Sequence, residues 1–300
     1  MIYTVTLNPA IDYVMHTDKI NIGETNRSTS EEIYIGGKGI NVSIVLRELG
    51  TESTALGFLA GFTGREFEKH LQEIGIKSDF VMLSEGSTRI NVKIKGAKET
   101  EINGKGPEIS DSDLQRLLLK IENIKDGDIL VLAGSIPGSL PDTTYSRILE
   151  VLKDKKINIV VDASGKLLVN ALKYKPFLIK PNKCELFEIF NIKNGNTEDV
   201  LSCARKLQEM GARNIIISMA REGALLLTEN GDIIRINAAE GKTVNSVGAG
   251  DSMVAGFIHG FIEKSDYEYA LKLGGACGGA TAFSDDLAKR EEILRIFATL

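Results

Sequence analysis

Apolar residues follow two different patterns along most of the chain. Short runs of consecutive apolar residues predict buried strands, and apolar residues spaced three and four apart predict helices. Strands are predicted at residues 2–7, 55–62, 128–133, 157–162, 177–180 and 214–218. Helices are predicted at 64–75, 114–124, 142–154, 196–210, 250–263, 267–283 and 290–298, and others begin near residues 38 and 182. This alternation predicts an α/β fold, a mostly parallel central sheet with helices on both faces.

Short polar signals predict where some of these elements begin or turn. Ser110 and Asp113 have the spacing of a capping box and predict the start of the helix near residue 114. Asn230-Gly231 lies between two apolar runs, 224–228 and 232–236, and predicts a hairpin.

Two stretches do not fit the strand-helix alternation. Residues 12–36 look extended and partly exposed, and residues 86–106 contain strands with one polar face. We expect them to form a small antiparallel sheet inserted into the main fold, as a lid or an oligomer surface. No linker or repeat divides the chain, so residues 1–300 are predicted to form a single domain that carries this lid.

Composition excludes several classes of protein. The formal net charge of -5 argues against nucleic acid or an anionic membrane as the main partner. Three widely spaced cysteines without a C-x-x-C motif indicate a reducing compartment, so we expect a cytoplasmic protein. The three histidines lack metal-ligand spacing. We expect neither a signal peptide at the N-terminus nor a membrane span, because the longest apolar run, 253–262, is too short.

A glycine-rich turn at residues 245–252 carries the most specific chemical signal. Gly248 and Gly250 permit close approach of a ligand to the backbone, and the helix that follows presents free amides to an anion. Asp251 would repel a phosphate, but it is well suited to take a proton from a hydroxyl that attacks one. The same residues also fit a tight turn with an ordinary first-turn acid.

Other polar residues lie just after predicted strands, where ligands bind in open α/β sheets. Asp12 follows the first strand, and Ser218 precedes Gly223 after a later one. Asn182 and Glu185 share one helix face and could order hydrated Mg²⁺, although a capped helix explains them as well.

A second glycine-rich helix start contains Lys38 and Asn41. Together with Arg27 and Arg89 from the inserted sheet, Lys38 could hold a phosphate, although alternating charges on an exposed strand are a simpler reading. The third glycine of the dinucleotide fingerprint is replaced by Val42, which argues against a nicotinamide-dependent oxidoreductase.

Five segments in a fixed order make the chain resemble the ribokinase-like sugar kinases of the phosphofructokinase B type. They are residues 6–12 (TLNPAID), 36–43 (GGKGINVS), 88–91 (TRIN), 180–185 (KPNKCE) and 247–252 (VGAGDS), and they extend over nearly the whole sequence. The resemblance implies a ribokinase-like three-layer sandwich with a β-sheet lid that is often used for dimerisation, and we therefore expect a homodimer.

The resemblance also implies roles for particular residues. Asp251 would be the catalytic base, and the amides around Gly248, Ala249 and Gly250 would form an anion hole. The sugar phosphate would contact Asp12, Arg27, Gly37, Lys38, Asn41 and Arg89. The nucleotide would contact Lys180, Asn182, Ser218, Gly223, Gly248 and Gly250. Asn182 and Glu185 would hold Mg²⁺ through water.

The activity implied is ATP-dependent phosphorylation of D-fructose 1-phosphate at its 6-hydroxyl, which gives fructose 1,6-bisphosphate. Tagatose 6-phosphate and fructose 6-phosphate are alternative acceptors, because the basic residues indicate a sugar phosphate more clearly than they indicate the carbon that carries it. A sensor that binds a sugar phosphate without turnover is the alternative from another class, and Asp251 argues against it.

Overall fold

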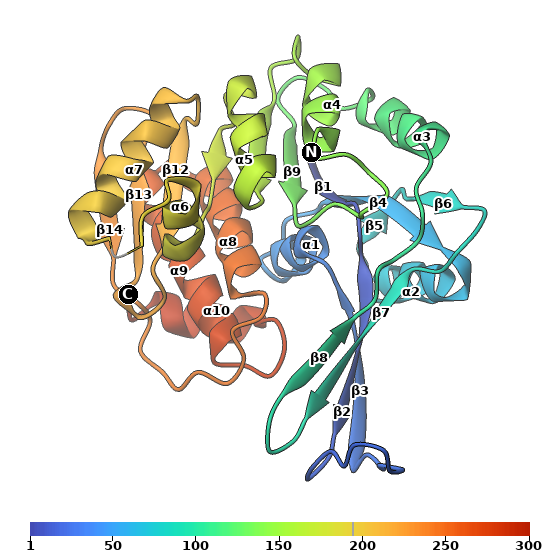
Figure 1. Ribbon diagram of the computed structural model, residues 1–300. Coiled ribbons are helices and arrows are strands. Elements are labelled where there is room, and N and C mark those ends of the chain that lie inside the picture. Colours follow the sequence, from blue (N-terminus) through green and yellow to red (C-terminus); the bar gives the residue numbers. More distant parts are fainter. Residues whose placement is uncertain (194) are drawn as a thin grey trace.

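A ten-stranded sheet with helices on both faces forms the body of the computed structural model, which describes residues 1–193 and 195–300 (Figure 1). The strands are β1 (Ile2–Thr6), β4 (Thr54–Ala60), β5 (Lys77–Ser78), β6 (Val81–Leu83), β9 (Ile129–Ala133), β10 (Asn158–Asp162), β11 (Leu178–Ile179), β12 (Asn214–Ser218), β13 (Ala224–Leu227) and β14 (Ile233–Ile236). Their order is β14-β13-β12-β11-β10-β9-β1-β4-β5, with β6 beside β4. The strands from β12 to β5 are parallel, and the predicted hairpin β13–β14 adds an antiparallel edge. The predicted α/β architecture is confirmed.

Three hydrophobic clusters fix the helices to the two faces of this sheet. One face packs against α3 (Asp111–Ile121), α4 (Thr144–Val151), α5 (Gly165–Ala171), α6 (Lys183–Ile189) and α7 (Thr197–Glu209). The other packs against α1 (Lys38–Glu48), α8 (Ala249–Lys264), α9 (Tyr267–Ala282) and α10 (Arg290–Phe297), and α2 (Gly61–Glu73) packs beside α1. Because strands and helices alternate, the carboxyl ends of the parallel strands meet at one edge, where most of the predicted site residues lie.

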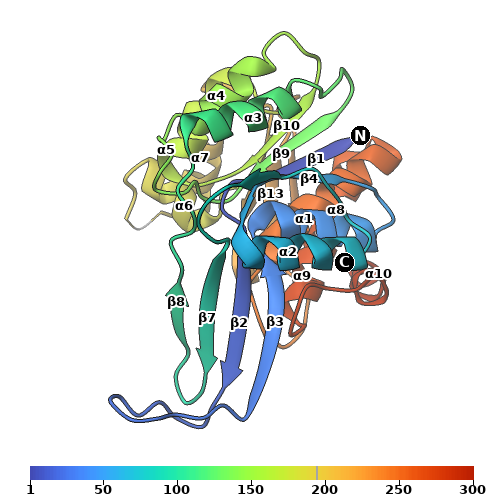
Figure 2. The same cartoon turned by 90° about the vertical axis from the view of Figure 1, so that its right-hand side faces the viewer.

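The lid is a separate four-stranded sheet that projects from this edge (Figure 2). Its strands are β2 (Ala10–His16), β3 (Ser30–Gly36), β7 (Arg89–Lys95) and β8 (Thr100–Asn103), in the order β3-β2-β7-β8. The expectation of an antiparallel sheet is wrong at its centre, because β2 and β7 pair in parallel. Each of these two strands leaves the body in the same direction and returns through its own hairpin.

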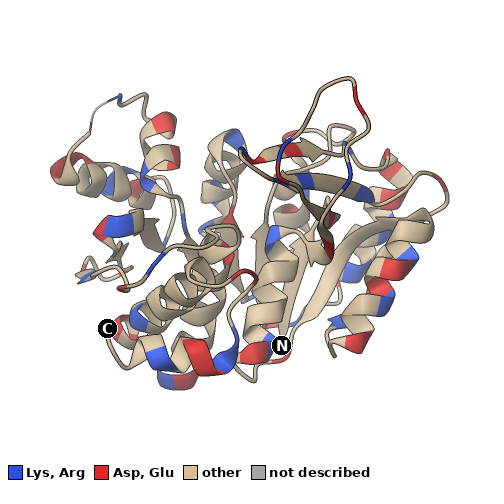
Figure 3. Ribbon diagram, turned by 90° about the horizontal axis from the view of Figure 1, so that it is seen from below, with Lys and Arg blue, Asp and Glu red and all other residues tan. Residues whose placement is uncertain are grey.

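The two faces of the lid differ in character. Basic and acidic positions both occur along it when it is seen from the lid end (Figure 3). Asp12, Asn91 and Lys93 line a cavity between the lid and the body. The side chains that alternate with them are mostly apolar, and two of them, Ile33 and Ile102, are 61% and 62% exposed. The lid therefore has a polar inner face and an apolar outer face.

Local signals in the sequence predicted some element boundaries and missed others. The capping box of Ser110 and Asp113 is present at the start of α3. Helix α5, followed by a short 3-10 turn over Leu172–Tyr174, was not predicted. Within the described part of the chain all three cysteines are unpaired, and no helix there is long and apolar enough to cross a membrane.

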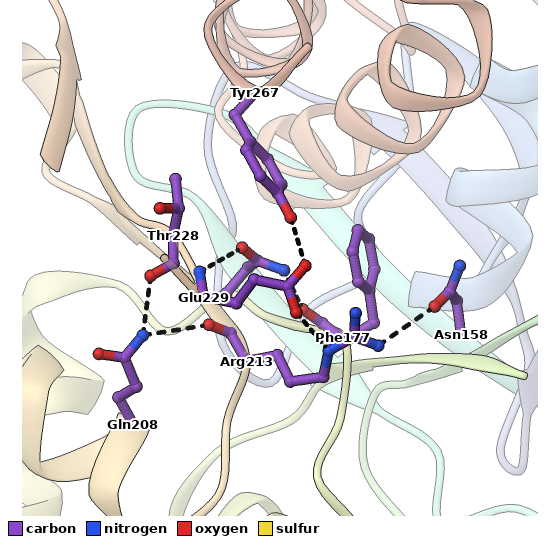
Figure 4. Close-up of polar contacts among 8 residues, drawn as sticks. Asn158, Phe177, Gln208, Arg213, Thr228, Glu229 and Tyr267 are labelled. Atoms are coloured by element: carbon purple, nitrogen blue, oxygen red, sulfur yellow. Dashed lines mark hydrogen bonds and ion pairs between the residues drawn. The ribbon is translucent and has the colours of Figure 1, made fainter. Parts of the chain in front are cut away.

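The amino ends of the strands carry a polar network that lies at the opposite edge from the site (Figure 4). The Arg213 guanidinium donates to Glu229 (Nε–Oε2, 2.7 Å), and the Tyr267 hydroxyl donates to the other oxygen of Glu229 (2.7 Å). Asn214 donates to the Phe177 carbonyl (2.8 Å) and accepts from the Glu229 amide (2.9 Å). These bonds join α9 to the sheet and explain the polar residues there without a ligand.

Candidate active site

The site is organised around the first turn of α8. Gly248 caps this helix in the left-handed region (φ 79°), where a non-glycine residue is strained. A Cβ added to Gly248 would lie 2.6 Å from Leu287 Cδ2, so any larger residue would also clash with this side chain. The turn directs the first amides of α8, which have no partner within the helix, toward the edge of the sheet. Asp251 lies in this turn and is only 5% exposed.

Asp251 has an unusual environment for a carboxylate. Burial, and next the negative charge of Asp162, raise its pKa to about 7. A hydrogen bond from Asn41 Nδ2 to Asp251 Oδ2 (2.7 Å) and the charges of Lys38 and Lys180 act in the opposite direction. A carboxylate whose pKa lies near neutrality binds a proton much more readily than an ordinary Asp, as a general base requires.

The glycines before α1 bring Lys38 and Asn41 to the same place. Gly37 caps α1 with φ 127°, and a Cβ there would lie 2.7 Å from Thr6 Cγ2. A Cβ on Gly39 would lie 2.5 Å from Thr6 Oγ1. The absence of side chains thus lets the start of α1 pack against the end of β1, which points Asn41 at Asp251.

Asp162, at the carboxyl end of β10, was missed in the sequence. It is 1% exposed and pairs with two ammonium groups, Lys38 Nζ and Lys180 Nζ, each at 3.4 Å. Burial acts to raise its pKa, but the charges of Lys180 and Lys38 outweigh burial and lower it. The signal was available, because a carboxylate directly after the apolar residues 159–161 lies at the carboxyl end of a buried strand.

Two cavities open at the start of α8. The first, of about 690 Å³, lies between the lid and the sheet edge. It is lined by these predicted residues: Asp12, Gly37, Lys38, Asn41, Arg89, Lys180, Glu185, Gly248 and Asp251. The second, of about 1550 Å³, includes Gly223 and Ala249. Asn182, Ser218 and Gly250 line both cavities, so a ligand in one can reach a ligand in the other at α8.

The lid supplies both predicted and unpredicted groups to the first cavity. Arg89 donates from Nε to the Asn8 carbonyl (3.1 Å), and burial lowers its pKa. Asp12 accepts from Asn91 and Lys93, neither of which was predicted, although both alternate with Arg89 on one strand face. Arg27 is exposed in the turn between β2 and β3 and does not line this cavity.

The residues predicted to hold a metal form a capping box. Asn182 Oδ1 accepts from the Glu185 amide (2.8 Å), and Glu185 Oε2 accepts from the Asn182 amide (2.9 Å). The capped-helix explanation is therefore correct, and both side chains still line the first cavity. Among the described residues no cluster of three or more His, Cys, Asp or Glu could hold a metal ion.

Ser218 and Gly223 bound the second cavity at the end of β12. The Ser218 amide donates to the Pro181 carbonyl (3.2 Å), which joins β12 to the loop before α6. Gly223 has φ 83°, a value that suits glycine, and it closes the short turn into β13. Lys180, predicted on the nucleotide side, instead lines the first cavity next to Asp162.

Comparison with known proteins relates this site to an enzyme family. The model of the pfkB family carbohydrate kinases matches residues 4–289. A protein of Bacillus subtilis (strain 168) named 1-phosphofructokinase is 47% identical over 99% of this chain and 97% of its own length. One of Bacillus licheniformis named D-tagatose-1-phosphate kinase is 39% identical over 96% of this chain and 94% of its own.

A solved structure shares the fold over the full length. Phosphofructokinase-2 from Escherichia coli, in complex with fructose-6-phosphate, has a TM-score of 0.92 at 27% identity and covers 100% of this chain and 98% of its own. The ribokinase-like fold with its lid is thus confirmed. The chain belongs to the pfkB family of carbohydrate kinases, enzymes that transfer a phosphoryl group to a sugar.

Proposed function

We propose that the enzyme transfers the γ-phosphoryl group of ATP to the 6-hydroxyl of D-fructose 1-phosphate, which yields fructose 1,6-bisphosphate. The observation that carries the proposal is the buried Asp251, with its pKa raised to about 7, at the point where the two cavities meet. The relative from B. subtilis, named for this activity, supports the choice of acceptor.

In this proposal the sugar phosphate lies in the first cavity and ATP in the second. Asp251 accepts the proton of the 6-hydroxyl while its oxygen attacks the γ-phosphorus. The amides at Gly248, Ala249 and Gly250 stabilise charge on the transferring group, because the first turn of a helix presents N–H donors that have no partner within the helix. The Ala249 amide donates to the Ser246 carbonyl (3.3 Å) and would exchange this bond for the transferring group. Asn41 holds Asp251 in place through its 2.7 Å hydrogen bond.

The remaining predicted contacts divide between the sugar and its phosphate. Asp12, Gly37 and Asn41 are proposed to bind sugar hydroxyls, and Lys38 and Arg89 the phosphate. Both cations line the first cavity and are partly shielded from water, which strengthens their attraction for an anion. Arg27 stays a proposed phosphate ligand that would act from the lid turn.

We further propose that Mg²⁺ enters with ATP. Asn182 and Glu185 supply oxygen ligands but are too few to bind the ion alone, which suits Mg²⁺, since it usually keeps several waters and is held largely by substrate phosphates. When bound, Mg²⁺ would neutralise developing charge on the phosphates. The two side chains would orient its water shell while their capping box keeps the start of α6 rigid.

D-Tagatose 1-phosphate is the second candidate acceptor. The B. licheniformis relative is named for it, so the alternative is this epimer of fructose 1-phosphate rather than tagatose 6-phosphate. Only the configuration at carbon 4 separates the two sugars, and one hydroxyl contact can decide between them.

The test is ADP formation with Mg²⁺ and ATP, with four acceptors compared: fructose 1-phosphate, tagatose 1-phosphate, fructose 6-phosphate and tagatose 6-phosphate. The proposal predicts the highest kcat/KM for fructose 1-phosphate. A preference for tagatose 1-phosphate would keep the mechanism and change the substrate. Binding of a sugar phosphate without ADP formation would support the sensor instead.

We also propose a homodimer assembled through the lid, in the cytoplasm where ATP is available. The apolar outer face of the lid, with Ile33 and Ile102 exposed, supports this assembly, because a second copy would remove that surface from water. Contiguous apolar surface rimmed by polar residues is typical of protein interfaces.

A further inference from the structure

Asp12 is bound entirely by side chains of a single neighbouring strand. Its Oδ1 accepts from Asn91 Nδ2 (2.8 Å), and its Oδ2 lies 2.9 Å from Lys93 Nζ. Asp12 on β2 and Asn91 on β7 are directly paired in the parallel ladder, and Lys93 follows two residues later on the same face. The three side chains form one polar unit, the Asp12 triad, on the inner face of the lid.

The Asn91 amide is itself held in one orientation. The Gly104 amide donates to Asn91 Oδ1 (3.2 Å), so the nitrogen of the Asn91 side chain is the atom that faces Asp12. Asp12 therefore receives one donor on each oxygen and keeps further lone pairs for the cavity that it lines. A carboxylate arranged in this way can accept hydrogen bonds from sugar hydroxyls.

An anionic substrate creates a difficulty for Asp12 that Lys93 can remove. The cavity takes a sugar phosphate under the proposed function, and an unpaired carboxylate would repel the phosphate dianion. The side chains of Asp12 and Lys93 are only 16% and 14% exposed, so water screens their charges weakly. The pair is neutral as a whole, so Asp12 can lie beside an anionic substrate without adding a net negative charge to the cavity.

We infer that Lys93 is a positioning residue that tightens sugar-phosphate binding by acting through Asp12, and that it does not bind the phosphate itself. The inference rests on the proposed function for the identity of the ligand. It assigns the lysine to recognition of hydroxyls on a phosphorylated ketose. Lys38, Arg89 and Arg27 remain the residues proposed to bind the phosphate.

The neighbouring lysine provides a matched control. Lys95 lies two residues further along the same strand face and, within the described residues, forms no ion pair. Lys93→Met and Lys95→Met remove the same charge and keep a similar apolar stem, but only the first leaves Asp12 without its ammonium partner.

The experiment measures the dissociation constant of fructose 1-phosphate by calorimetry for wild type, both lysine variants, Asp12→Asn and the double variant Asp12→Asn/Lys93→Met. We expect Lys93→Met to weaken binding about 10- to 100-fold, as loss of a partly buried charge partner does, and Lys95→Met less than about threefold. ATP binding and the melting temperature should change little in either.

The double variant separates the two possible roles of Lys93. If Lys93 acts through Asp12, Lys93→Met should have little further effect once Asp12 is Asn, so the two losses are not additive. The inference would be overturned in favour of direct phosphate binding if the affinity losses of Lys93→Met and Asp12→Asn multiply in the double variant, or if the two lysine variants weaken binding equally. A wild-type protein that binds fructose 1-phosphate without ADP formation would overturn the proposed function alone, and one that does not bind it would overturn both.

Discussion

The proposed chemistry of this kinase depends on how single carboxylates are placed. Asp251 and Asp162 are both buried, yet their pKa values move in opposite directions. Asp162 receives two lysine ammoniums and stays ionised, whereas Asp251 receives one neutral amide and the negative charge of Asp162. Burial, and next the charge of Asp162, therefore raise the pKa of Asp251, which is how an aspartate could act as a base near pH 7.

The pH dependence of kcat/KM should report this arrangement. Asp251 must be deprotonated to act as base, so kcat/KM should fall about tenfold per pH unit below pH 7. Asp162→Asn removes a negative charge near Asp251 and should move this limb to lower pH. Protonation of the substrate phosphate could also produce an acidic limb, but the pKa of the free substrate does not change with the mutation. A limb that stays at the same pH in Asp162→Asn would therefore show that Asp251 is not the titrating group.

The same pKa shift predicts that activity costs stability. A carboxyl whose pKa is raised from 3.8 to about 7 in the folded state makes a contribution to the free energy of unfolding that is lost as pH rises through this window. Asp251→Asn should therefore increase the free energy of unfolding at pH 8, by at most about 4 kcal/mol, and raise the melting temperature. The gain should shrink toward pH 4, and a variant equally destabilised at both pH values would argue against the raised pKa.

At the scale of elements, the site is built from the beginnings of helices at the carboxyl edge of the sheet. The glycine turns before α1 and α8 and the capping box at α6 could be found in the sequence, because these motifs are local. Asp162 could not be placed beside Lys38 and Lys180 in the same way. Its partners are 124 and 18 residues away, and only the order of the strands brings them together.

The left-handed cap of α8 should be required for catalysis as well as for stability. Gly248→Ala places a Cβ against Leu287 at a residue with φ 79°, so it should lower the free energy of unfolding by about 1–2 kcal/mol. The same substitution should displace Asp251 and lower kcat at least tenfold. Gly231→Ala, at φ 88° with open space around it, should cost about 1 kcal/mol and leave kcat unchanged. Denaturant unfolding and steady-state assays measure both effects, and equal kcat values in the two variants would contradict this role.

The whole molecule combines a body that could be predicted with a lid whose pairing could not. Helix and strand periodicity predicted the parallel sheet and its two helical layers, since burial on both faces produces long apolar runs. The parallel β2–β7 pair at the centre of the lid joins segments about 79 residues apart and has no local signal. The unpredicted helix α5 is short, and its residues 165–171 include glycine and asparagine.

Assembly through the lid should depend on its apolar outer face. Ile33→Lys places a charge on this face, so the dimer should dissociate at least tenfold more readily. Leu119→Lys, at a similarly exposed position on α3, should leave assembly unchanged. Sedimentation velocity measures both, and a wild-type monomer, or a dimer unaffected by Ile33→Lys, would contradict assembly through this surface.

The central claim is that Asp251 is the base that activates the sugar hydroxyl. The most direct measurement is kcat for ADP formation from ATP and fructose 1-phosphate, compared between wild type and Asp251→Asn. The variant keeps the size of the side chain and one acceptor oxygen but cannot accept the proton, so kcat should fall about 10²- to 10⁴-fold while KM changes little. Turnover near the wild-type rate in a folded variant would contradict the claim and return Asp251 to the role of an ordinary first-turn acid.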